Sequence, residues 1–247
     1  MSAPFQNPAE YRAWNDAMIL KHDPAAYYAN RWVRLLERAR LRAIQRGLKL
    51  ARGREAVLEL GCGFGFVLRR IALSGGFRRI LGMDLSLPSL RDARERIPQG
   101  VGLTQGDGAA PPFRLGAFDA VCMTEVIEHV PDPVALLRAS RGLLAPGGVL
   151  VVTAPNERVI NRLKCLLRRT GLWRLFFGRY EAADRMEEEW HLHAMDRGLL
   201  VGWLAEAGYE VRKVQPLPAA LLPMRYLAVG APVGAGDDGA GGAGTGR

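Results

Sequence analysis

The chain has 247 residues, of which 49% are hydrophobic and 24% charged, and its formal net charge is +9. This length and composition fit one large globular domain and argue against a fibrous or disordered chain. The three cysteines lack the spacing of a metal site or a disulfide framework, no signal peptide is recognisable, and no apolar run approaches the ~20 residues of a membrane span. We therefore expect a cytoplasmic protein. Its basic charge would favour an anionic surface, either nucleic acid or acidic lipid, if the charges are clustered.

Residues 1–52 are predicted to form an N-terminal helical extension. Residues 10–20 and about 25–50 carry apolar and aromatic side chains at helical spacing, and the break His22-Asp23-Pro24 separates them. Aspartate followed by proline is typical of a helix start. We expect these helices to pack on a sheet edge or to cover a pocket, with most of their side chains serving packing.

Residues 53–230 alternate between strand and helix patterns, which predicts an α/β domain with a doubly wound sheet. Uniformly apolar strands such as these are buried on both faces, as a parallel sheet requires. A Gly/Ala-rich tail over residues 231–247 is too poor in large apolar residues to fold and is expected to be disordered. The predicted strands are Val57–Leu60, Arg79–Met83, Gly102–Gln105, Phe118–Met123, Val149–Thr153, Tyr209–Val214 and Tyr226–Val229.

A glycine-rich turn follows the first of these strands, in the stretch Glu59-Leu60-Gly61-Cys62-Gly63-Phe64-Gly65. A side chain at Gly61 or Gly63 would keep the backbone away from a ligand. Free amides in the turn, and at the start of the helix that begins at about Phe66, favour a polar or anionic group. The stretch therefore predicts the nucleotide-binding corner of a doubly wound sheet.

Acidic residues stand at the ends of successive predicted strands: Glu59, Asp84, Asp107 and Thr124-Glu125. Ligands bind beyond the carboxyl ends of the strands in such sheets, so these acids are expected to line one groove. Asp84 is placed to accept hydrogen bonds from ribose hydroxyls, Asp107 from an exocyclic amine, and Glu59 from an ammonium group. A ligand with a pyrophosphate would meet too much negative charge.

This pattern resembles the class I S-adenosylmethionine-dependent methyltransferases. Their E/D-x-G-x-G-x-G turn is matched in full, and their acids after strands two and three correspond to Asp84 and Asp107. The nicotinamide fingerprint G-x-G-x-x-G is not met, because Phe66 stands at its last position. The resemblance implies a seven-stranded Rossmann-like methyltransferase fold and S-adenosyl-L-methionine as cofactor. The expected cofactor-binding residues are Glu59, Gly61, Cys62, Gly63, Gly65, Asp84, Leu85, Asp107, Gly108 and Thr124.

A second motif, Glu125-Val126-Ile127-Glu128-His129, spaces two acids and a histidine at i, i+3 and i+4. One helical turn would place all three on one face, where they could hold Mg²⁺, with Glu125 and His129 as catalytic residues. Alternatively, His129 could act as a general base without a metal. The motif resembles the E-x-x-E-H of ubiquinone-pathway O-methyltransferases and small-RNA 2′-O-methyltransferases, where these residues bind metal. Of the later pair His191 and His193, at least one is expected to serve packing or capping.

An insertion at about residues 156–190 interrupts the strand and helix rhythm, and within it residues 158–180 interleave arginines with large apolar side chains. This pattern fits a lid over a hydrophobic pocket or peripheral contact with an anionic membrane. We expect a methyltransferase acting on a small, hydrophobic or lipid-like acceptor, with O-methylation favoured. The alternatives are an RNA 2′-O-methyltransferase, although RNA-binding motifs are lacking, and a non-catalytic cofactor-binding protein.

Overall fold

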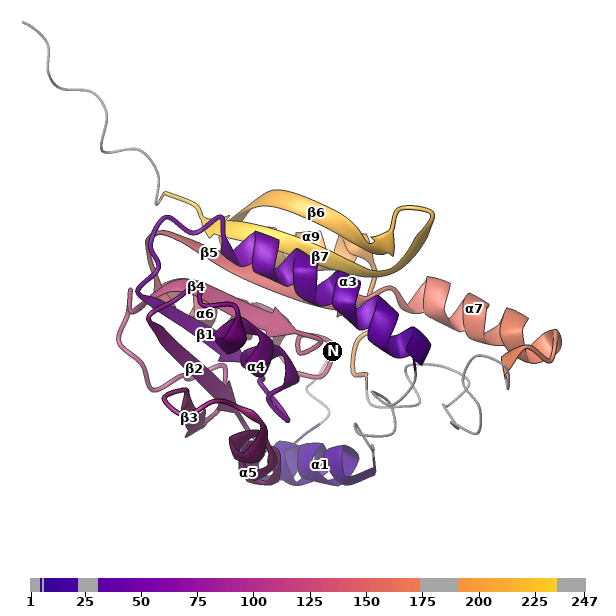
Figure 1. Ribbon diagram of the computed structural model, residues 1–247, viewed down its shortest axis with the longest axis horizontal. Coiled ribbons are helices and arrows are strands. Elements are labelled where there is room, and N and C mark those ends of the chain that lie inside the picture. Colours follow the sequence, from indigo (N-terminus) through magenta and orange to yellow (C-terminus); the bar gives the residue numbers. More distant parts are fainter. Residues whose placement is uncertain (1–4, 6, 22–30, 174–190, 235–247) are drawn as a thin grey trace, which may run out of the picture.

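A central sheet of seven strands organises the structure, a computed structural model that describes residues 5, 7–21, 31–173 and 191–234 (Figure 1). The strand order is β3-β2-β1-β4-β5-β7-β6. Neighbours from β3 to β5 are parallel, whereas β7 runs antiparallel to both β5 and β6. The strands are β1 Ala56–Leu60, β2 Arg79–Asp84, β3 Gly102–Gln105, β4 Phe118–Thr124, β5 Leu144–Pro155, β6 Tyr209–Ala219 and β7 Leu222–Pro232.

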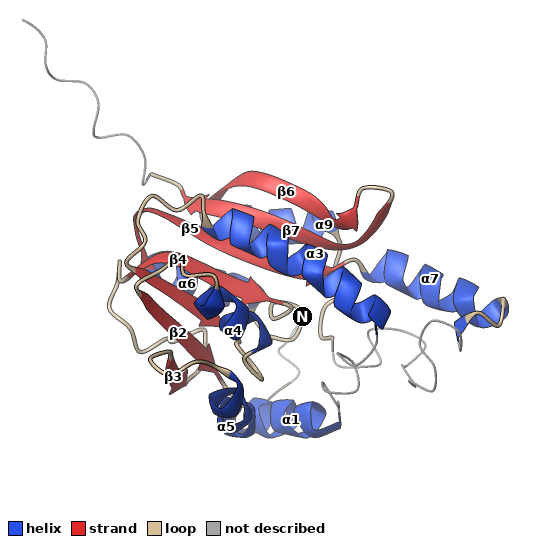
Figure 2. Ribbon diagram, viewed as in Figure 1, coloured by secondary structure: helices blue, strands red, loops and turns tan. Residues whose placement is uncertain are grey.

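Helices cover both faces of this sheet, as the doubly wound prediction requires (Figure 2). Buried side chains of α3 and α4 form one core with the sheet, and those of α6 and α9 form the core on the opposite face. The described helices are α1 Pro8–Lys21, α3 Arg31–Leu48, α4 Phe66–Leu73, α5 Leu87–Arg96, α6 Pro133–Leu143, α7 Glu157–Arg169 and α9 Arg197–Glu206.

The alternation of side chains along β1 explains how one strand serves both cores. Val57 packs in the α3 and α4 core, whereas Leu58 and Leu60 pack in the α6 and α9 core. All of β1 is buried, and so is nearly all of β4. The prediction of strands buried on both faces is therefore confirmed at the sheet centre, while β2 and β3 toward the edge are more exposed.

Local side-chain signals set several helix boundaries. Ser86 caps α5 by accepting a hydrogen bond from the Ser89 amide, and Asp196 caps α9 by accepting one from the Leu199 amide. Gly208 has a φ of 83° just after α9, a conformation that glycine adopts without steric cost. These caps fix the helices that pack on the sheet.

Strands β5, β6 and β7 are longer than predicted. β6 and β7 form a hairpin that pairs from Tyr209 with Pro232 to Ala219 with Leu222. Its prolines interrupt the apolar alternation in the sequence, but a register shift at Leu217/Pro218 accommodates one of them. Of the predicted insertion, residues 174–190 lie outside the described part, as do residues 235–247 of the predicted disordered tail. None of the described helices has the length and apolar character needed to cross a membrane.

Candidate active site

The glycine turn between β1 and α4 is tied to the end of β2. The amides of Gly61 and Cys62 both donate to the Met83 carbonyl, at 2.8 and 3.0 Å. The expectation of free amides is therefore wrong for most of this turn, because they fix the neighbouring strand. Gly61 is required by packing, since a Cβ there would lie 2.4 Å from Val126 Cγ2, whereas a Cβ at Gly63 would meet open space.

Asp84, at the end of β2, is held by backbone amides. Gly63 N–H donates to its Oδ2 at 2.7 Å and Ser86 N–H donates to its Oδ1 at 2.9 Å. Burial raises the pKa of Asp84 and the charge of Asp16 acts in the same direction, while these two amides oppose the rise. Among the described residues, no cationic side chain pairs with Asp84. The carboxylate is thus fixed in place and keeps capacity to accept hydrogen bonds from a ligand.

Glu59 lies beneath the glycine turn and is only 1% exposed. Thr124 donates its hydroxyl to Glu59 Oε1 at 3.2 Å, whereas Oε2 is buried without a hydrogen-bond partner. Burial raises the pKa of Glu59 to about 8, and the Thr124 hydrogen bond and the charge of Arg40 only partly offset it. An unsatisfied buried carboxyl oxygen is costly, which makes a cationic ligand nearby favourable.

The remaining predicted cofactor residues differ in how they face this region. Asp107 is exposed and accepts the Ala109 amide at 2.9 Å. Gly108 packs on α6, since a Cβ there would lie 2.6 Å from Leu136 Cδ1. The prediction that Cys62 contacts a ligand is not supported for its side chain, because the thiol is buried in a core cluster with Leu68. Gly65 is the N-cap of α4, and Leu85 accepts a side-chain hydrogen bond from Gln105 at its carbonyl.

Helix α1 supplies residues that the sequence did not single out. The Tyr11 hydroxyl donates to the His129 carbonyl at 3.4 Å and its ring stacks on Trp14. Burial raises the pKa of Tyr11, and the charges of Asp107 and Asp84 add to that rise, so Tyr11 lies close to both acids. Asp16 Oδ1 is buried without a hydrogen-bond partner. α1 therefore lies beside two of the strand-end acids, Asp84 and Asp107.

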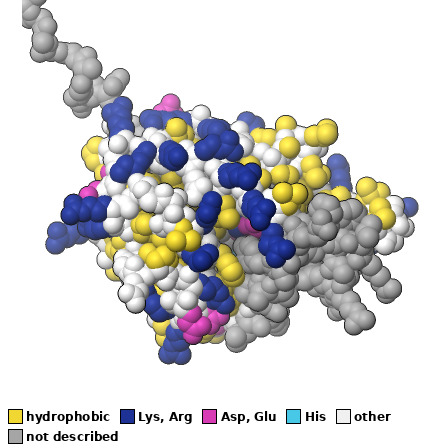
Figure 3. Space-filling model, in the orientation of Figure 1, with side chains coloured by type: hydrophobic (Ala, Val, Ile, Leu, Met, Phe, Trp, Pro, Cys, Tyr) yellow, Lys and Arg dark blue, Asp and Glu magenta, His cyan; other side chains and the backbone are white. Residues whose placement is uncertain are grey.

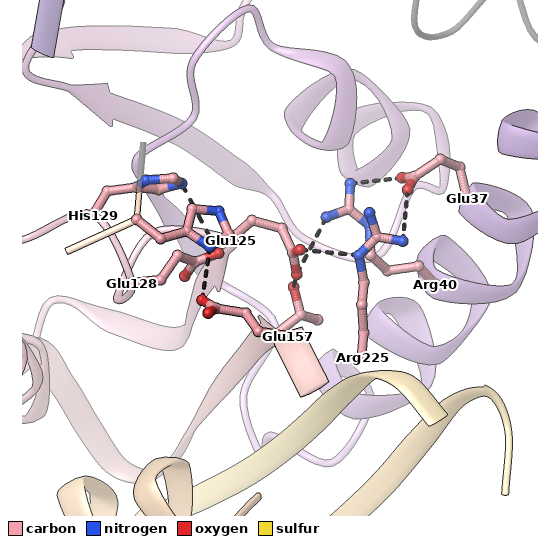
Figure 4. A network of polar contacts seen from close by, with 9 residues as sticks. Glu37, Arg40, Glu125, Glu128, His129, Glu157 and Arg225 are labelled. Atoms are coloured by element: carbon pink, nitrogen blue, oxygen red, sulfur yellow. Dashed lines mark hydrogen bonds and ion pairs between the residues drawn. The ribbon is translucent and has the colours of Figure 1, made fainter. Parts of the chain in front are cut away.

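Glu125, at the end of β4, points into an ion-pair network and away from His129 (Figure 4). Arg225 Nε donates to its Oε2 at 2.9 Å, and Arg40 lies 3.8 Å from its Oε1. Arg40 and Arg225 in turn both pair with Glu37, at 2.6 and 3.4 Å. Burial alone would raise the pKa of Glu125, but the two arginines lower it overall.

The predicted helical face with Glu125, Glu128 and His129 is therefore wrong. Glu125 has a φ of 55°, a left-handed conformation that prevents a helix from starting at this residue. Glu128 and His129 instead join His191, and their ligand atoms all lie within 4.8 Å of one another. His191 Nδ1 is 2.8 Å from Glu157 Oε1, which orients its ring.

This cluster combines a buried carboxylate with two imidazoles. Glu128 is fully buried and neither of its carboxylate oxygens has a hydrogen-bond partner. Burial raises the pKa of Glu128, and the charges of Glu125 and Glu157 add to the rise. His193 stands apart, since its Nε2 lies 2.8 Å from the Val130 carbonyl and its ring packs on Trp203. The expected packing role of one histidine of the pair is thus confirmed for His193.

Comparisons with known proteins agree with this geometry. Residues 58–152 match the family model of a methyltransferase domain. The chain is 33% identical over 148 residues to the ubiquinone biosynthesis O-methyltransferase of Xanthomonas euvesicatoria pv. vesicatoria, covering 55% of this chain and 60% of that protein. It is 38% identical over 105 residues to the enzyme of that name from Chromobacterium violaceum, covering 41% and 44%. An S-adenosylmethionine-dependent methyltransferase structure from Mesorhizobium loti aligns with a TM-score of 0.59 at 22% identity, covering 78% of this chain and 97% of that one.

Residues 58–152 thus match a methyltransferase domain, and the chain is similar to the class I S-adenosylmethionine-dependent methyltransferases. Its matches span 60% or less of the length of the curated relatives reported above. The class I methyltransferase fold predicted from the strand order and glycine turn is confirmed, with seven strands and the antiparallel β7.

Proposed function

We propose that this protein transfers a methyl group from S-adenosyl-L-methionine to an oxygen of a small, hydrophobic or lipid-like acceptor. The observation that carries the proposal is its similarity to relatives named ubiquinone biosynthesis O-methyltransferase. A carboxylate groove beside a carboxylate–histidine cluster supports it further. A phenol or catechol of the kind found in quinone precursors is the acceptor class that best fits these names.

The residues of the groove fit this cofactor. Asp16 Oδ1 and Glu59 Oε2 are buried acceptors without donors, and Asp84 is held by two amides, so the groove suits a ligand rich in donors and carrying positive charge. Space at the Gly63 Cβ position leaves room for it. When bound, S-adenosyl-L-methionine supplies an electrophilic sulfonium methyl group. We assign Asp84 to the ribose hydroxyls, Asp107 to the adenine amine and Glu59 to the ammonium side of the cofactor.

His129 is the proposed general base. Its carbonyl is bonded by Tyr11, which lies near Asp84 and Asp107, so the histidine borders the cofactor groove. As the C–S bond breaks and the new C–O bond forms, the acceptor hydroxyl must lose a proton, which the imidazole of His129 takes. Alignment of two bound reactants contributes ~7–11 kcal/mol to lowering the barrier. A positioned base adds about 10²–10⁴-fold.

A divalent metal ion at Glu128, His129 and His191 is a second element of the proposal. Two unpartnered oxygens on Glu128 and two imidazoles form a donor set that fits such an ion. Nitrogen donors favour a transition metal such as Mn²⁺ or Zn²⁺ over the Mg²⁺ expected from the sequence, because Mg²⁺ prefers oxygen ligands. A bound ion would stabilise the negative charge on the acceptor oxygen. If a metal ion were bound, His129 would be one of its ligands, and water rather than His129 would accept the proton of the acceptor hydroxyl.

The basic segment 158–180 is proposed to close the acceptor pocket and to contact an anionic membrane. In its described part, α7 and the residues after it expose Leu166 (58%) and Leu172 (43%) beside arginines, and residues 174–180 lie outside the described structure. Exposed leucines flanked by cations suit a lipid-like acceptor or a lipid surface. Loss of activity on a long-chain acceptor, but not on a short soluble one, in Leu166→Ser would support the lid.

The decisive experiment measures both binding and turnover. Calorimetry should detect S-adenosyl-L-methionine and its demethylated form, and not a nicotinamide dinucleotide. Methyl transfer from labelled cofactor should appear in a prenylated catechol and not in small RNA. His129→Gln should lower turnover at least 100-fold with unchanged cofactor affinity. His193→Gln is the matched control, because that ring bonds only to the Val130 carbonyl. Methyl transfer to RNA instead of the catechol would overturn the proposed acceptor class. Binding of the cofactor without turnover on any acceptor would favour a non-catalytic protein.

A further inference from the structure

The outward surface of α3 and α4 concentrates the basic charge of this chain. On α3 the outward arginines recur every fourth residue, which places them along one side of the helix. Two further arginines stand on the exposed side of α4, which packs beside α3. Lys and Arg side chains accordingly run across the face that carries α3 (Figure 3). We define this arginine face as Arg34, Arg38, Arg42, Arg46, Arg69 and Arg70, all of which are exposed.

These charges are not neutralised by acids of the protein. Among the described residues, no carboxylate pairs within 4.0 Å of any arginine of this face. The one acid on the two helices, Glu37, is buried and pairs with Arg40 and Arg225 on the inner side. Six cations that pair with no carboxylate of the described residues form a positive potential that favours an anionic partner.

The arginine face also has a shape and an apolar component. A hollow of about 310 Å³ is lined by Arg38, Leu41, Arg42 and Arg70, so three arginine side chains from two helices border one depression. Leu35 and Leu73 are each 56% exposed on the outward sides of the same two helices. Guanidinium groups match phosphate oxygens by paired hydrogen bonds. The leucines gain from contact with acyl chains, which a nucleic acid does not offer.

We propose that the arginine face docks the protein on an anionic phospholipid bilayer, with a lipid phosphate in the hollow lined by Arg38, Arg42 and Arg70. Among the described residues of α3 and α4, none of the exposed ones is aromatic, which argues against single-stranded nucleic acid, since that is bound by stacking. The inference goes beyond methyl transfer and does not depend on it. It also uses a surface separate from α7.

The test is flotation of the full chain with vesicles of phosphatidylcholine alone or with about 30% phosphatidylglycerol, at low and high salt. Binding should require the anionic lipid and weaken with salt. Arg38→Gln/Arg42→Gln should weaken it about fivefold for each arginine and about 25-fold together. The matched control is Arg114→Gln/Arg197→Gln, because both are exposed and lie outside the arginine face. It removes the same net charge and should change binding by less than about twofold.

Three results would overturn the proposal. Equal weakening in the two double variants would mean that net charge alone attracts the protein. Full retention in Arg38→Gln/Arg42→Gln together with loss in Leu166→Ser/Leu172→Ser would assign membrane contact to α7. Tight, Arg38-dependent binding of an RNA duplex without vesicle binding would make the partner a nucleic acid. Unchanged melting temperatures are expected in both arginine variants, because the substituted side chains are exposed and unpaired.

Discussion

Asp84 and Glu125 occupy equivalent places in the sequence pattern, each an acid at the end of a parallel strand, yet they have opposite environments. Asp84 is bonded by two backbone amides, has no cationic partner among the described residues, and has its pKa raised. Glu125 is paired with Arg225 and Arg40, and its pKa is lowered. A strand-end carboxylate is available to a ligand when the protein itself has not neutralised it. The comparison thus supports the proposal that Asp84 binds the cofactor, whereas Glu125 takes part in an ion-pair network of the protein itself.

The largest expected effect concerns stability and tests the ion pairs of Glu125. Glu125→Ala would remove one of the two acids that Arg40 and Arg225 share, and both arginines are largely buried, with side chains 6% and 17% exposed. Removing one partner of such a pair costs about 3 kcal/mol of unfolding free energy. Urea denaturation measures this loss. Glu210→Ala is the control, because its exposed pair with Arg212 contributes ~0–1 kcal/mol. A stable Glu125→Ala protein that binds cofactor normally but has lost turnover would restore Glu125 as a catalytic residue.

The second prediction tests the proposed cofactor binding by Asp84. Asp84→Asn removes the charge that accepts the proposed ribose hydroxyls, and two charge-assisted hydrogen bonds weakened by ~1.5 kcal/mol each lower cofactor affinity about 100-fold. Stability without cofactor should fall by about 1 kcal/mol, because an amide side chain has one acceptor oxygen and can keep only one of the two backbone N–H hydrogen bonds. Calorimetry and urea denaturation on the same sample separate the two effects. Asp92→Asn on the exposed side of α5 is the control, and equal loss of affinity there would contradict the assignment.

The third prediction concerns pH and Glu59. Because its folded pKa is about 8 against an ordinary 4.5, the folded state keeps a proton that the unfolded state loses. The contribution of Glu59 is full below about pH 4.5 and is lost as the pH rises toward 8. Glu59→Gln should flatten this decline. Acid-side and alkaline-side urea titrations of the two proteins provide the measurement.

Cofactor binding offers an independent readout for Glu59. A cation bound beside it stabilises the charged carboxylate, so binding near neutral pH should release up to about one proton. Calorimetric enthalpies in buffers with different ionisation enthalpies report that proton. The release should vanish in Glu59→Gln. Identical proton release in both proteins would show that Glu59 does not face the ammonium group.

The sequence allowed the fold and half of this comparison to be predicted. Several features depend on residues close together in the sequence and can be recognised without knowing distant contacts. These are the alternation of strands and helices, the caps Ser86 and Asp196, and the glycine turn. The ion pairing of Glu125 could not be predicted from the neighbouring sequence, because its partner Arg225 lies 100 residues away. Its left-handed backbone also broke the helical spacing from which the metal triad was predicted. The cluster with His191 formed instead, across the chain.

The smallest effect concerns α1, whose contact with the site spans 118 residues between Tyr11 and His129. Tyr11→Phe keeps the ring that stacks on Trp14 and removes only the hydroxyl bonded to the His129 carbonyl. At 3.4 Å this is a weak hydrogen bond, and its loss costs about 0.5–1 kcal/mol. If α1 closes over the cofactor, the same amount appears as a two- to fivefold loss of cofactor affinity, because closure stabilises only the bound state by this contact. Tyr226→Phe is the control, since that hydroxyl accepts a hydrogen bond from Asn156 at the start of α7. Loss of stability with unchanged affinity in Tyr11→Phe would make α1 a packing element alone.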